Sequence, residues 1–463
     1  MKIYLALACL LVPAWLKAQM PQIQVSENQR FLMTEDGKPF FWTADTAWEL
    51  FHKLDEKEAE TYFQKRASQG FNVIQAVALA ELDGINTPNA KGEKPFRNLS
   101  KMKPNPQYFK YVMQLIEKAG EHGLYVALLP TWGDKLFKNS WGTGPEIFNT
   151  ENAYEYGKWL GLWFRSTPNI IWVLGGDRNP REGSDDVEVW RAMAKGLKEG
   201  LGLFKTGVFT FHPQPHSPGG SSDWFQADEW LSFNMHQTGH CPDELSYPKI
   251  QHDYNLSSVK PVLDGEPLYE DHPICFKAKE NGYSLPSQIR RIMYSNVMVG
   301  ACGQTYGCHD VWQMYKAGET GVNGPLRPWE KALDLPMANQ MKYLKNLMLS
   351  RPYFDRIPDQ GLLDGEQVKD KQYVSASRDG AGTYAFIYFP QGQTKNVDTH
   401  ALAAARLRVW WYDPRTGASF LKGELQNYGS FSAVPPSSGE GNDWVLVIDD
   451  AAKGYPAPGT VAY

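Results

Sequence analysis

The 463-residue chain is poor in cysteine and carries no concentrated block of charge. Its five cysteines are too few for a disulfide scaffold of this length, and none form the C-x-x-C pair typical of structural zinc sites. The formal net charge is −5 and no long Lys/Arg run occurs, so we expect no nucleic-acid partner.

Several loop motifs are also missing. No G-x-G-x-x-G follows the first expected strand and no G-x-x-x-x-G-K-[ST] loop occurs, which removes support for nucleotide binding. No G-x-S-x-G elbow is present, so a serine esterase lacks support. We therefore expect an activity that requires no cofactor.

Long hydrophobic runs are missing except at residues 3–16. This run follows Lys2 and is closed by Lys17 and Ala18, the pattern of a secretory signal, and it is short for a membrane span. We expect cleavage after Ala18, with residues 1–18 as the signal peptide. The mature protein is then exported, to the periplasm, the cell surface or the extracellular medium, without a membrane span.

Aromatic residues, in contrast, are abundant: 16 Trp, 23 Tyr and 22 Phe make up 13% of the chain. Aromatic faces pack against the C–H faces of sugars, so this composition favours an oligo- or polysaccharide ligand. A large aromatic core explains the same composition equally well.

Short apolar segments alternate with helical patterns up to about residue 350. Nearly continuous apolar strands are typical of a parallel sheet buried on both faces, and eight of them predict a (β/α)8 TIM barrel, with a doubly wound sheet as the alternative. The expected strands are residues 40–44, 71–79, 124–132, 169–177, 204–212, 231–237, 260–266 and 303–307, and the main helices are residues 55–70, 106–123, 152–165, 186–200, 242–254, 287–299 and 335–349.

The pattern changes after Pro352, where helical periodicity stops. Short alternating strands, separated by Gly, Pro, Asp and Asn, predict a small antiparallel β-sandwich domain in residues 353–463, with a turn at residues 413–417. Residues 19–352 then form the barrel domain, which begins with a β-hairpin whose expected turn is Asp36-Gly37. The expected strands of the second domain are residues 373–377, 383–389, 405–412, 419–420 and 444–448.

Two carboxylates stand out at the carboxyl ends of the strands, where function collects in a parallel barrel. Asp177 follows an apolar strand and two glycines, which permit a sharp turn and close approach of a ligand, and Glu266 ends the apolar strand PVLDG. They belong to the fourth and seventh strands, so we expect both to reach one cavity. Other strand-end residues are candidates for substrate binding: Asp45, Trp48, Gln75, Trp132, His212, Asn234, His236 and Tyr306.

Two carboxyl groups facing one bond are what glycoside hydrolysis requires. One must be protonated to donate to the leaving oxygen, and the other must be ionised to attack or stabilise the sugar cation. Apolar surroundings and mutual repulsion would raise the pKa of Asp177. The structural alternatives are a capping role for Asp177 and an ion pair of Glu266 with Arg290, while Asp264 is expected one layer deeper in a structural role.

Several segments resemble a known family. The stretches GKPFFWTADTAWELF (37–51), RASQGFNVIQ (66–75), NIIWVLGGDRNP (169–180) and KPVLDGEPLYE (260–270) are similar to the apiosidase-like glycoside hydrolases, glycoside hydrolase family 140. The segment RVWWYDPRTG (408–417) is similar to the β-sandwich that follows the barrel in that family.

The resemblance implies a retaining glycosidase, with the Asp of GGDR as acid/base and the Glu of DGEP as nucleophile, here Asp177 and Glu266. It also implies a plant-type polysaccharide substrate, such as the apiose-bearing side chains of pectin (rhamnogalacturonan II). The wider clan carries Asn-Glu at the fourth strand, and the Gly-Asp of this sequence fits the apiosidase-like branch.

The softer candidates each have a structural alternative. Trp48 and Trp132 are either sugar platforms or core residues. His212 and His236 either contact the substrate or the nucleophile, or are satisfied buried side chains. Tyr306 is a candidate to orient the nucleophile.

Some histidines and cysteines have the spacing of metal ligands or of a disulfide, but we expect structural roles for them. The H-x-x-x-H pairs at 212–216 and 236–240 have metal-like spacing, but the first contains two prolines and cannot form one helix face, so no metal site is expected. Cys302 and Cys308 flank an expected strand and are expected to be buried thiols.

Two other function classes stay open. One is a non-catalytic protein whose barrel has lost its activity and only binds carbohydrate, although the presence of both acids argues against it. A peptidase is the other alternative, but the sequence shows neither a nucleophile triad nor a zinc-binding helix.

Overall fold

The computed structural model describes residues 20–202, 207–365 and 368–461. The predicted signal peptide, residues 1–18, lies outside these ranges. Within them, none of the helices combines the length and the apolar character needed to cross a bilayer.

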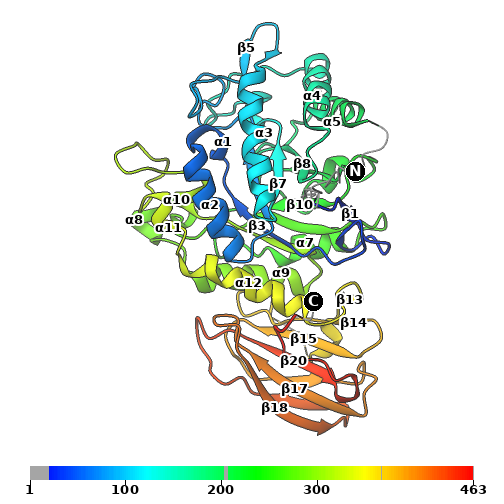
Figure 1. Cartoon of the computed structure of the whole chain (residues 1–463). Coiled ribbons are helices and arrows are strands. Elements are labelled where there is room, and N and C mark those ends of the chain that lie inside the picture. The colour runs from blue at the N-terminus through cyan, green and yellow to red at the C-terminus, as the bar shows by residue number, and fades with distance from the viewer. Residues whose placement is uncertain (1–19, 203–206, 366–367, 462–463) are drawn as a thin grey trace, which may run out of the picture.

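Eight parallel strands form the wall of the first domain (Figure 1). They are β3 (Trp42–Thr46), β4 (Val73–Val77), β7 (Tyr125–Leu129), β8 (Ile170–Gly175), β9 (Phe209–His212), β10 (Asn234–Gln237), β11 (Val262–Glu266) and β12 (Gly303–Tyr306). Six pair in the order β12–β3–β4–β7–β8–β9, and β10 pairs with β11. The N–H of Ser232 donates to the Phe209 carbonyl (2.8 Å) and that of Cys302 to the Val262 carbonyl (2.9 Å), which joins the two ladders. The predicted barrel is confirmed.

The barrel strands are short apolar runs because both of their faces are covered. Every residue of β3, β4 and β7 is buried, as expected for a parallel sheet between a packed interior and a layer of helices. The longer helices of that layer are α2 (Glu56–Ser68), α3 (Pro106–Glu121), α4 (Thr150–Phe164), α5 (Asp186–Leu201), α7 (Tyr247–Tyr254), α9 (Pro286–Met298) and α12 (Pro336–Leu349).

Local capping signals explain where these helices begin. Asp55 caps α2 in a capping box with Glu58, and Asn149 does the same for α4 with Asn152. The shorter elements of this domain are α1 (Leu50–Lys53), β5 (Phe96–Asn98), β6 (Lys103–Pro104), α6 (Ser222–Phe225), α8 (Ala278–Asn281), α10 (His309–Trp312) and α11 (Trp329–Ala332).

The N-terminal segment contains the predicted Asp36-Gly37 turn and, before it, a second antiparallel pair. Strands β1 (Ile23–Val25) and β2 (Leu32–Thr34) pair antiparallel, and residues 26–31 connect them. The Asp36-Gly37 turn follows β2, where the Gly37 N–H donates to the Thr34 carbonyl (2.8 Å). The turn brings Pro39 back antiparallel to Met33, and the Thr34 N–H donates to the Lys38 carbonyl (2.9 Å). The predicted turn is therefore confirmed, whereas the pairing of β1 with β2 ahead of it was not predicted.

The second domain is antiparallel throughout. One sheet contains, in spatial order, β13 (Arg356–Pro358), β14 (Ser375–Asp379), β15 (Tyr384–Phe389), β20 (Trp444–Asp450), β17 (Arg406–Tyr412) and β18 (Ser419–Gln426), and the other pairs β16 (Lys395–Asp398) with β19 (Ser430–Ala433). Val397 and Ala433 of the small sheet share an apolar cluster with Ile387, Val409 and Leu446 of the large one. The predicted antiparallel domain is confirmed.

Strand β18 is longer than the two residues predicted for it. Most of its side chains are exposed or half-buried, because it is an edge strand, so it lacks the apolar alternation on which the prediction depended. The predicted turn at residues 413–417 joins β17 to β18, where the Gly417 N–H donates to the Asp413 carbonyl (2.8 Å).

The antiparallel domain packs against α9 and α12 of the barrel (Figure 1). Tyr294 of α9 stacks on Tyr388 of β15, with ring centroids 5.1 Å apart. Tyr384, Phe386 and Tyr388 belong to the same apolar cluster as the barrel core. The two domains therefore share one continuous interior.

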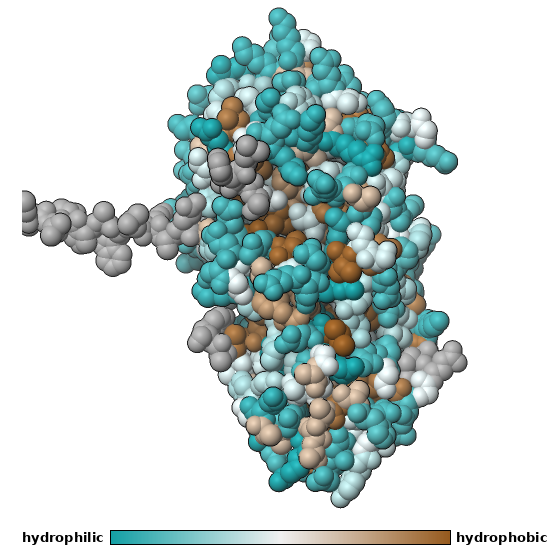
Figure 2. Space-filling view, turned by 90° about the vertical axis from the view of Figure 1, so that its right-hand side faces the viewer, coloured by the Kyte–Doolittle hydropathy of each residue, from teal (hydrophilic) through white to brown (hydrophobic). Residues whose placement is uncertain are grey.

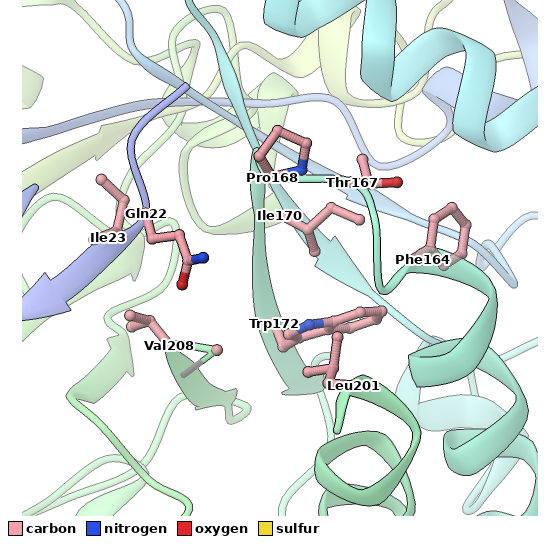
Figure 3. A pocket seen from close by; sticks show the side chains of 10 residues that line it. Gln22, Ile23, Phe164, Thr167, Pro168, Ile170, Trp172, Leu201 and Val208 are labelled. Carbon is pink, nitrogen blue, oxygen red and sulfur yellow. The ribbon is translucent and has the colours of Figure 1, made fainter. Parts of the chain in front are cut away.

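The surface offers few apolar areas away from this interior. Figure 2 shows a face that is mostly hydrophilic, with hydrophobic residues in small separate patches. A pocket opens where β8 and β9 begin, lined by Gln22, Ile170, Trp172 and Val208 (Figure 3). It lies at the amino ends of these strands, away from the carboxyl ends that carry the candidate carboxylates.

Candidate active site

Asp177 and Glu266 both lie at the carboxyl end of the barrel. Glu266 is the last residue of β11, and Asp177 follows the end of β8 by two residues. The Asp177 side chain keeps 20% of its surface exposed and that of Glu266 keeps 7%, so both are largely desolvated while remaining reachable.

Two glycines create the turn that presents Asp177. Gly175 and Gly176 have φ of +86° and +115°, and Asp177 itself has φ of +51°. A Cβ on Gly175 would lie 2.4 Å from the His212 carbonyl oxygen, and one on Gly176 would lie 2.7 Å from the Trp132 ring. Only glycine fits at both positions, and the left-handed backbone of Asp177 is the kind of strain that clusters at functional sites.

The buried imidazole of His212 lies between the two acids. Its Nδ1 accepts from the backbone N–H of Asp177 (3.4 Å), and its Nε2 lies 3.1 Å from Oε2 of Glu266. Because Nδ1 is the acceptor, the ring proton is on the nitrogen that faces Glu266. One side chain at the end of β9 therefore links both carboxyl-bearing segments.

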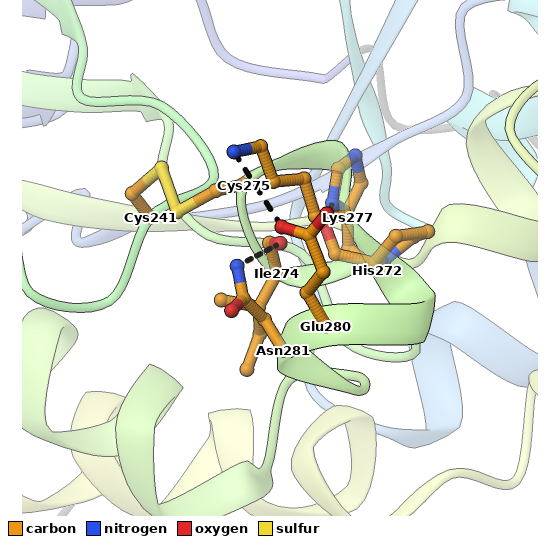
Figure 4. The surroundings of a disulfide bond; sticks show 8 residues. Cys241, His272, Ile274, Cys275, Lys277, Glu280 and Asn281 are labelled. Carbon is orange, nitrogen blue, oxygen red and sulfur yellow. Dashed lines mark hydrogen bonds and ion pairs between the residues drawn. A yellow bond between two sulfur atoms is a disulfide. The ribbon is translucent and has the colours of Figure 1, made fainter.

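A second imidazole, His240, contacts the other oxygen of Glu266. Its Nε2 lies 3.3 Å from Oε1, and its ring stacks on His272 with centroids 4.1 Å apart. Cys241, the next residue, forms a disulfide with Cys275, whose N–H donates to the His240 carbonyl (2.9 Å). The disulfide ties together the loops that follow β10 and β11 (Figure 4).

These contacts push the pKa values of the two acids apart. Burial, and next the charge of Glu266, raise the pKa of Asp177 to about 6, although Arg178, His212 and the Trp141 hydrogen bond oppose the shift. Burial would also raise the pKa of Glu266, but His212 and His240 outweigh it and hold that pKa well below its usual range. One acid is suited to hold a proton and the other to stay ionised.

Aromatic side chains form the wall beside His212. The rings of Trp48 and Trp132 lie 5.0 Å apart and approach the His212 ring to 5.4 and 5.8 Å. Trp132 Nε1 and the hydroxyl of Tyr269 are buried without a hydrogen-bond partner among the described residues. Such unsatisfied polar groups at the carboxyl end of the barrel are what a polar ligand would engage.

The segment after β7 adds residues that the sequence pattern did not indicate. The indole N–H of Trp141 donates to Oδ2 of Asp177 (3.3 Å), and Arg178 lies against the Trp141 ring, 4.8 Å from its centroid. Glu81, after β4, is close enough to Asp177 that burial and the Asp177 charge together raise the pKa of Glu81 to about 8.

The structure places Asp45 and His236 on the outer side of the barrel wall. Asp45 forms a fully buried ion pair with Arg66 of α2 (2.6 Å), and His236 pairs with Asp253 of α7 (3.0 Å). Each side chain therefore lies between its strand and the covering helix, because successive residues of a strand face opposite sides. Neither contacts the two candidate acids.

Three other predicted substrate-binding residues form hydrogen bonds with groups other than the two candidate acids. Gln75 donates to the Gly265 carbonyl (2.8 Å), beneath the candidate nucleophile, and Asn234 donates to Gln226 (2.9 Å). Tyr306 donates to Glu270 (2.7 Å), so it does not orient Glu266 as predicted. All three are completely buried, and a strand-end position alone did not distinguish such residues from those that face the cavity.

Three further sequence predictions concern the side-chain partners of Arg290, Asp264 and the cysteines. Arg290 pairs with Asp443 of the second domain (2.7 Å), not with Glu266. Asp264 accepts from Thr238 (2.6 Å) in the interior, as expected for a structural residue. Cys302 and Cys308 are buried free thiols, as predicted, whereas the disulfide in the loops was not predicted.

The metal-like histidine spacings do not produce converging side chains. His216 turns to Asp223 (3.0 Å), while His212 faces Glu266. His236 and His240 likewise bind different carboxylates. Among the residues that the structure describes, no group of three or more His, Cys, Asp and Glu side chains is arranged to hold a metal ion.

Comparison with known proteins agrees with this arrangement. The family model "Apiosidase-like, catalytic domain" matches residues 26–355, and "Putative collagen-binding domain of a collagenase" matches residues 357–449. No curated protein matches the chain.

Solved structures with the same two-domain fold include a protein named glycoside hydrolase, which is 31% identical over 93% of this chain and 97% of its own, with a TM-score of 0.83. A glycoside hydrolase family 5 protein from Bacteroides vulgatus is 29% identical over 95% of this chain and 96% of its own, with a TM-score of 0.85.

The barrel and these relatives define the class, a glycoside hydrolase fold followed by an antiparallel domain. The match over residues 26–355 is specific enough to go further. The chain belongs to the apiosidase-like family, and the resemblance seen in its sequence segments is confirmed.

Proposed function

We propose that this protein is a retaining glycoside hydrolase in which Asp177 is the acid/base and Glu266 the nucleophile. The observation that carries the proposal is the position of His212, which contacts the backbone of one acid and the carboxylate of the other. The opposite shifts of the two pKa values match the protonation states that the reaction needs.

The reaction follows from these states. Asp177 donates its proton to the glycosidic oxygen while a Glu266 oxygen attacks the anomeric carbon, which releases the leaving sugar and forms a glycosyl ester. Asp177, now a carboxylate, then takes a proton from water as the water oxygen attacks the same carbon. The C–O bond to Glu266 breaks, and the enzyme returns to its starting state.

We propose retention of configuration because the apiosidase-like resemblance implies it, and the separation of the two carboxyl groups is the geometric criterion. Inverting enzymes separate their carboxyl groups by about 6.5–9.5 Å to admit a water, whereas retaining enzymes separate them by about 5–5.5 Å. Here a single imidazole ring contacts both segments, and the charge of Glu266 reaches Asp177 strongly enough to raise its pKa.

The substrate class we propose is plant-type polysaccharide, with apiose-bearing pectin side chains (rhamnogalacturonan II) as the leading candidate. The family match and the aromatic walls of the site support it. We also propose that the protein is exported, on the basis of the apolar segment that follows Lys2. The first test is to incubate the protein with pectic oligosaccharides and identify the products and their initial anomer.

Replacing the two acids separates their roles. We expect Glu266→Gln to lower kcat by at least about a thousandfold, because the amide cannot form the ester. Asp177→Ala should lose activity on natural leaving groups but retain it on a substrate with an activated leaving group, and added azide should yield a glycosyl azide of retained configuration.

Asp264→Asn is the matched control, since Asp264 lies two residues before Glu266 but bonds to Thr238. We expect this change to lower the melting temperature while kcat stays close to that of the wild-type protein. Near-normal activity of the Glu266→Gln protein on the natural substrate would rule out the assignment.

A further inference from the structure

Trp141 differs from the other tryptophans in its exposure. It is 50% exposed, and of the tryptophans that lie in the described part of the chain it alone is in the exposed class. A single exposed aromatic ring is common on protein surfaces. This one is unusual because it is bonded to a candidate catalytic carboxyl group.

The ring is held in this position by its neighbours. Its N–H donates to Oδ2 of Asp177, and the Arg178 guanidinium lies over the ring, with Cζ 4.8 Å from the centroid. Arg178 in turn donates to the carbonyls of Phe137 and Lys138, both at 3.0 Å, which fixes the loop that carries Trp141. The guanidinium lies over one face of the indole, and half of the Trp141 surface stays exposed to solvent.

The atom that Trp141 contacts decides which part of a substrate it would meet. Asp177 must donate its proton to the oxygen of the leaving group, so that oxygen comes within hydrogen-bond distance of the Asp177 carboxyl. Trp141 is bonded to this carboxyl, whereas the rings of Trp48 and Trp132 lie against the imidazole of His212. Trp141 is therefore on the leaving-group side of the bond to be broken.

We propose that Trp141 forms a binding subsite for the leaving saccharide, whose C–H face stacks on the exposed face of the indole. This inference rests on the proposed function. It makes Trp141 a specificity residue that favours a sugar over a small alcohol as leaving group, since only a sugar ring covers the indole.

The test compares two leaving groups on the same glycone: an apiose-terminated pectic oligosaccharide and methyl apioside. We expect Trp141→Ala to lower kcat/KM for the oligosaccharide by roughly 10- to 100-fold and to change that for the methyl glycoside far less. Tyr428→Ala, which removes an 85% exposed ring of the second domain, is the matched control and should change neither.

Trp141→Phe separates stacking from the hydrogen bond to Asp177. Phenylalanine keeps an aromatic face but cannot donate, and the Trp141 bond lowers the pKa of Asp177. We expect this variant to keep most of the preference for the oligosaccharide. Loss of the hydrogen bond should also raise the pKa of Asp177, so the basic limb of the pH profile should shift to higher pH. Equal losses on both substrates in Trp141→Ala, or no loss on either, would overturn the inference.

A binding measurement covers the case in which the proposed reaction is wrong. Titration of the Glu266→Gln protein with the oligosaccharide should quench tryptophan fluorescence, and Trp141→Ala in that background should remove the quench. If the wild-type protein cleaves neither substrate but this quench is seen, the reaction fails and the subsite stands. Absence of the quench overturns the subsite, whatever the activity.

Discussion

At the scale of single residues, the candidate site contains two acids whose pKa values are shifted in opposite directions although both are largely desolvated. Histidine contacts account for the difference: Glu266 has an imidazole at each oxygen, and Asp177 has only a backbone link to one of them. The surroundings of a carboxyl group, not its type, set its role.

The pH dependence of kcat/KM should follow from these shifts. The pKa of Asp177 is raised to about 6, so its acid function is present at lower pH and is lost as the pH rises through that value. The pKa of Glu266 is lowered, so its ionised form is lost only as the pH falls below the usual range of glutamate. We expect a bell-shaped profile on the acidic side of neutrality, and maximal activity at pH 8 would contradict it.

His240→Ala should shift the acidic limb of that profile. Removing one of the two imidazoles that lower the pKa of Glu266 lets burial raise that pKa, so activity should begin to fall at a higher pH. The matched control is His216→Ala, since His216 pairs with Asp223 away from Glu266. An acidic limb that stays in place would show that His240 does not hold the charge of Glu266.

Strand periodicity led to candidate residues at the carboxyl end of the barrel. Asp177 and Glu266 could be predicted because each ends an apolar run. His240 and Trp141 could not, because they lie in long loops where no period constrains a side chain. Asp45 and Tyr306 were misjudged because a residue at the end of a strand can also turn toward the helix layer or a buried partner.

At the scale of elements, the loops that follow β10 and β11 are connected by the Cys241–Cys275 disulfide. The bond closes a segment of 34 residues that carries Glu266, the candidate nucleophile, and it is adjacent to His240. We expect the double variant Cys241→Ser/Cys275→Ser to lose about 3–4 kcal/mol of unfolding free energy by the chain-entropy estimate, and to lose activity as His240 becomes less well placed.

Reduction of the wild-type protein is the control for this prediction. Dithiothreitol should lower its activity and melting temperature toward those of the double variant and leave the double variant unchanged. Full activity and an unchanged melting temperature after complete reduction would show that the loops do not need the bond.

The strands and helices of the barrel could be predicted because short apolar runs, Gly stops and helix-capping residues agree with one another along the chain. Elements without an apolar face could not. The exposed residues of β18 and the short pair β16 and β19 carry little of the alternation that marks a half-buried strand. The disulfide was missed because pairing depends on loops whose approach no local pattern encodes.

At the scale of the whole molecule, the second domain completes the interior of the first. Arg351 forms a buried ion pair with Asp449 of β20 (2.7 Å), and Arg290 forms another with Asp443 (2.7 Å). Together with the shared apolar cluster, these pairs predict that both domains unfold in one transition.

Arg351→Met tests this coupling. Removing one partner of a buried pair leaves an uncompensated charge and is expected to cost about 3–5 kcal/mol. The melting of both domains, followed by tryptophan fluorescence and by far-ultraviolet circular dichroism, should shift together. Lys53→Met, which breaks the more exposed pair with Glu319, is the control and should change little. Two separate transitions would contradict a common interior.

In the proposed reaction, the interaction between the charges of the two acids would also determine when the proton moves. The negative charge of Glu266 strengthens the hold of Asp177 on its proton. Once Glu266 is bound covalently to a sugar it is neutral, and this contribution disappears. Asp177 then releases protons more readily at the stage when a base is needed, so the same side chain serves both half-reactions without any rearrangement of the barrel.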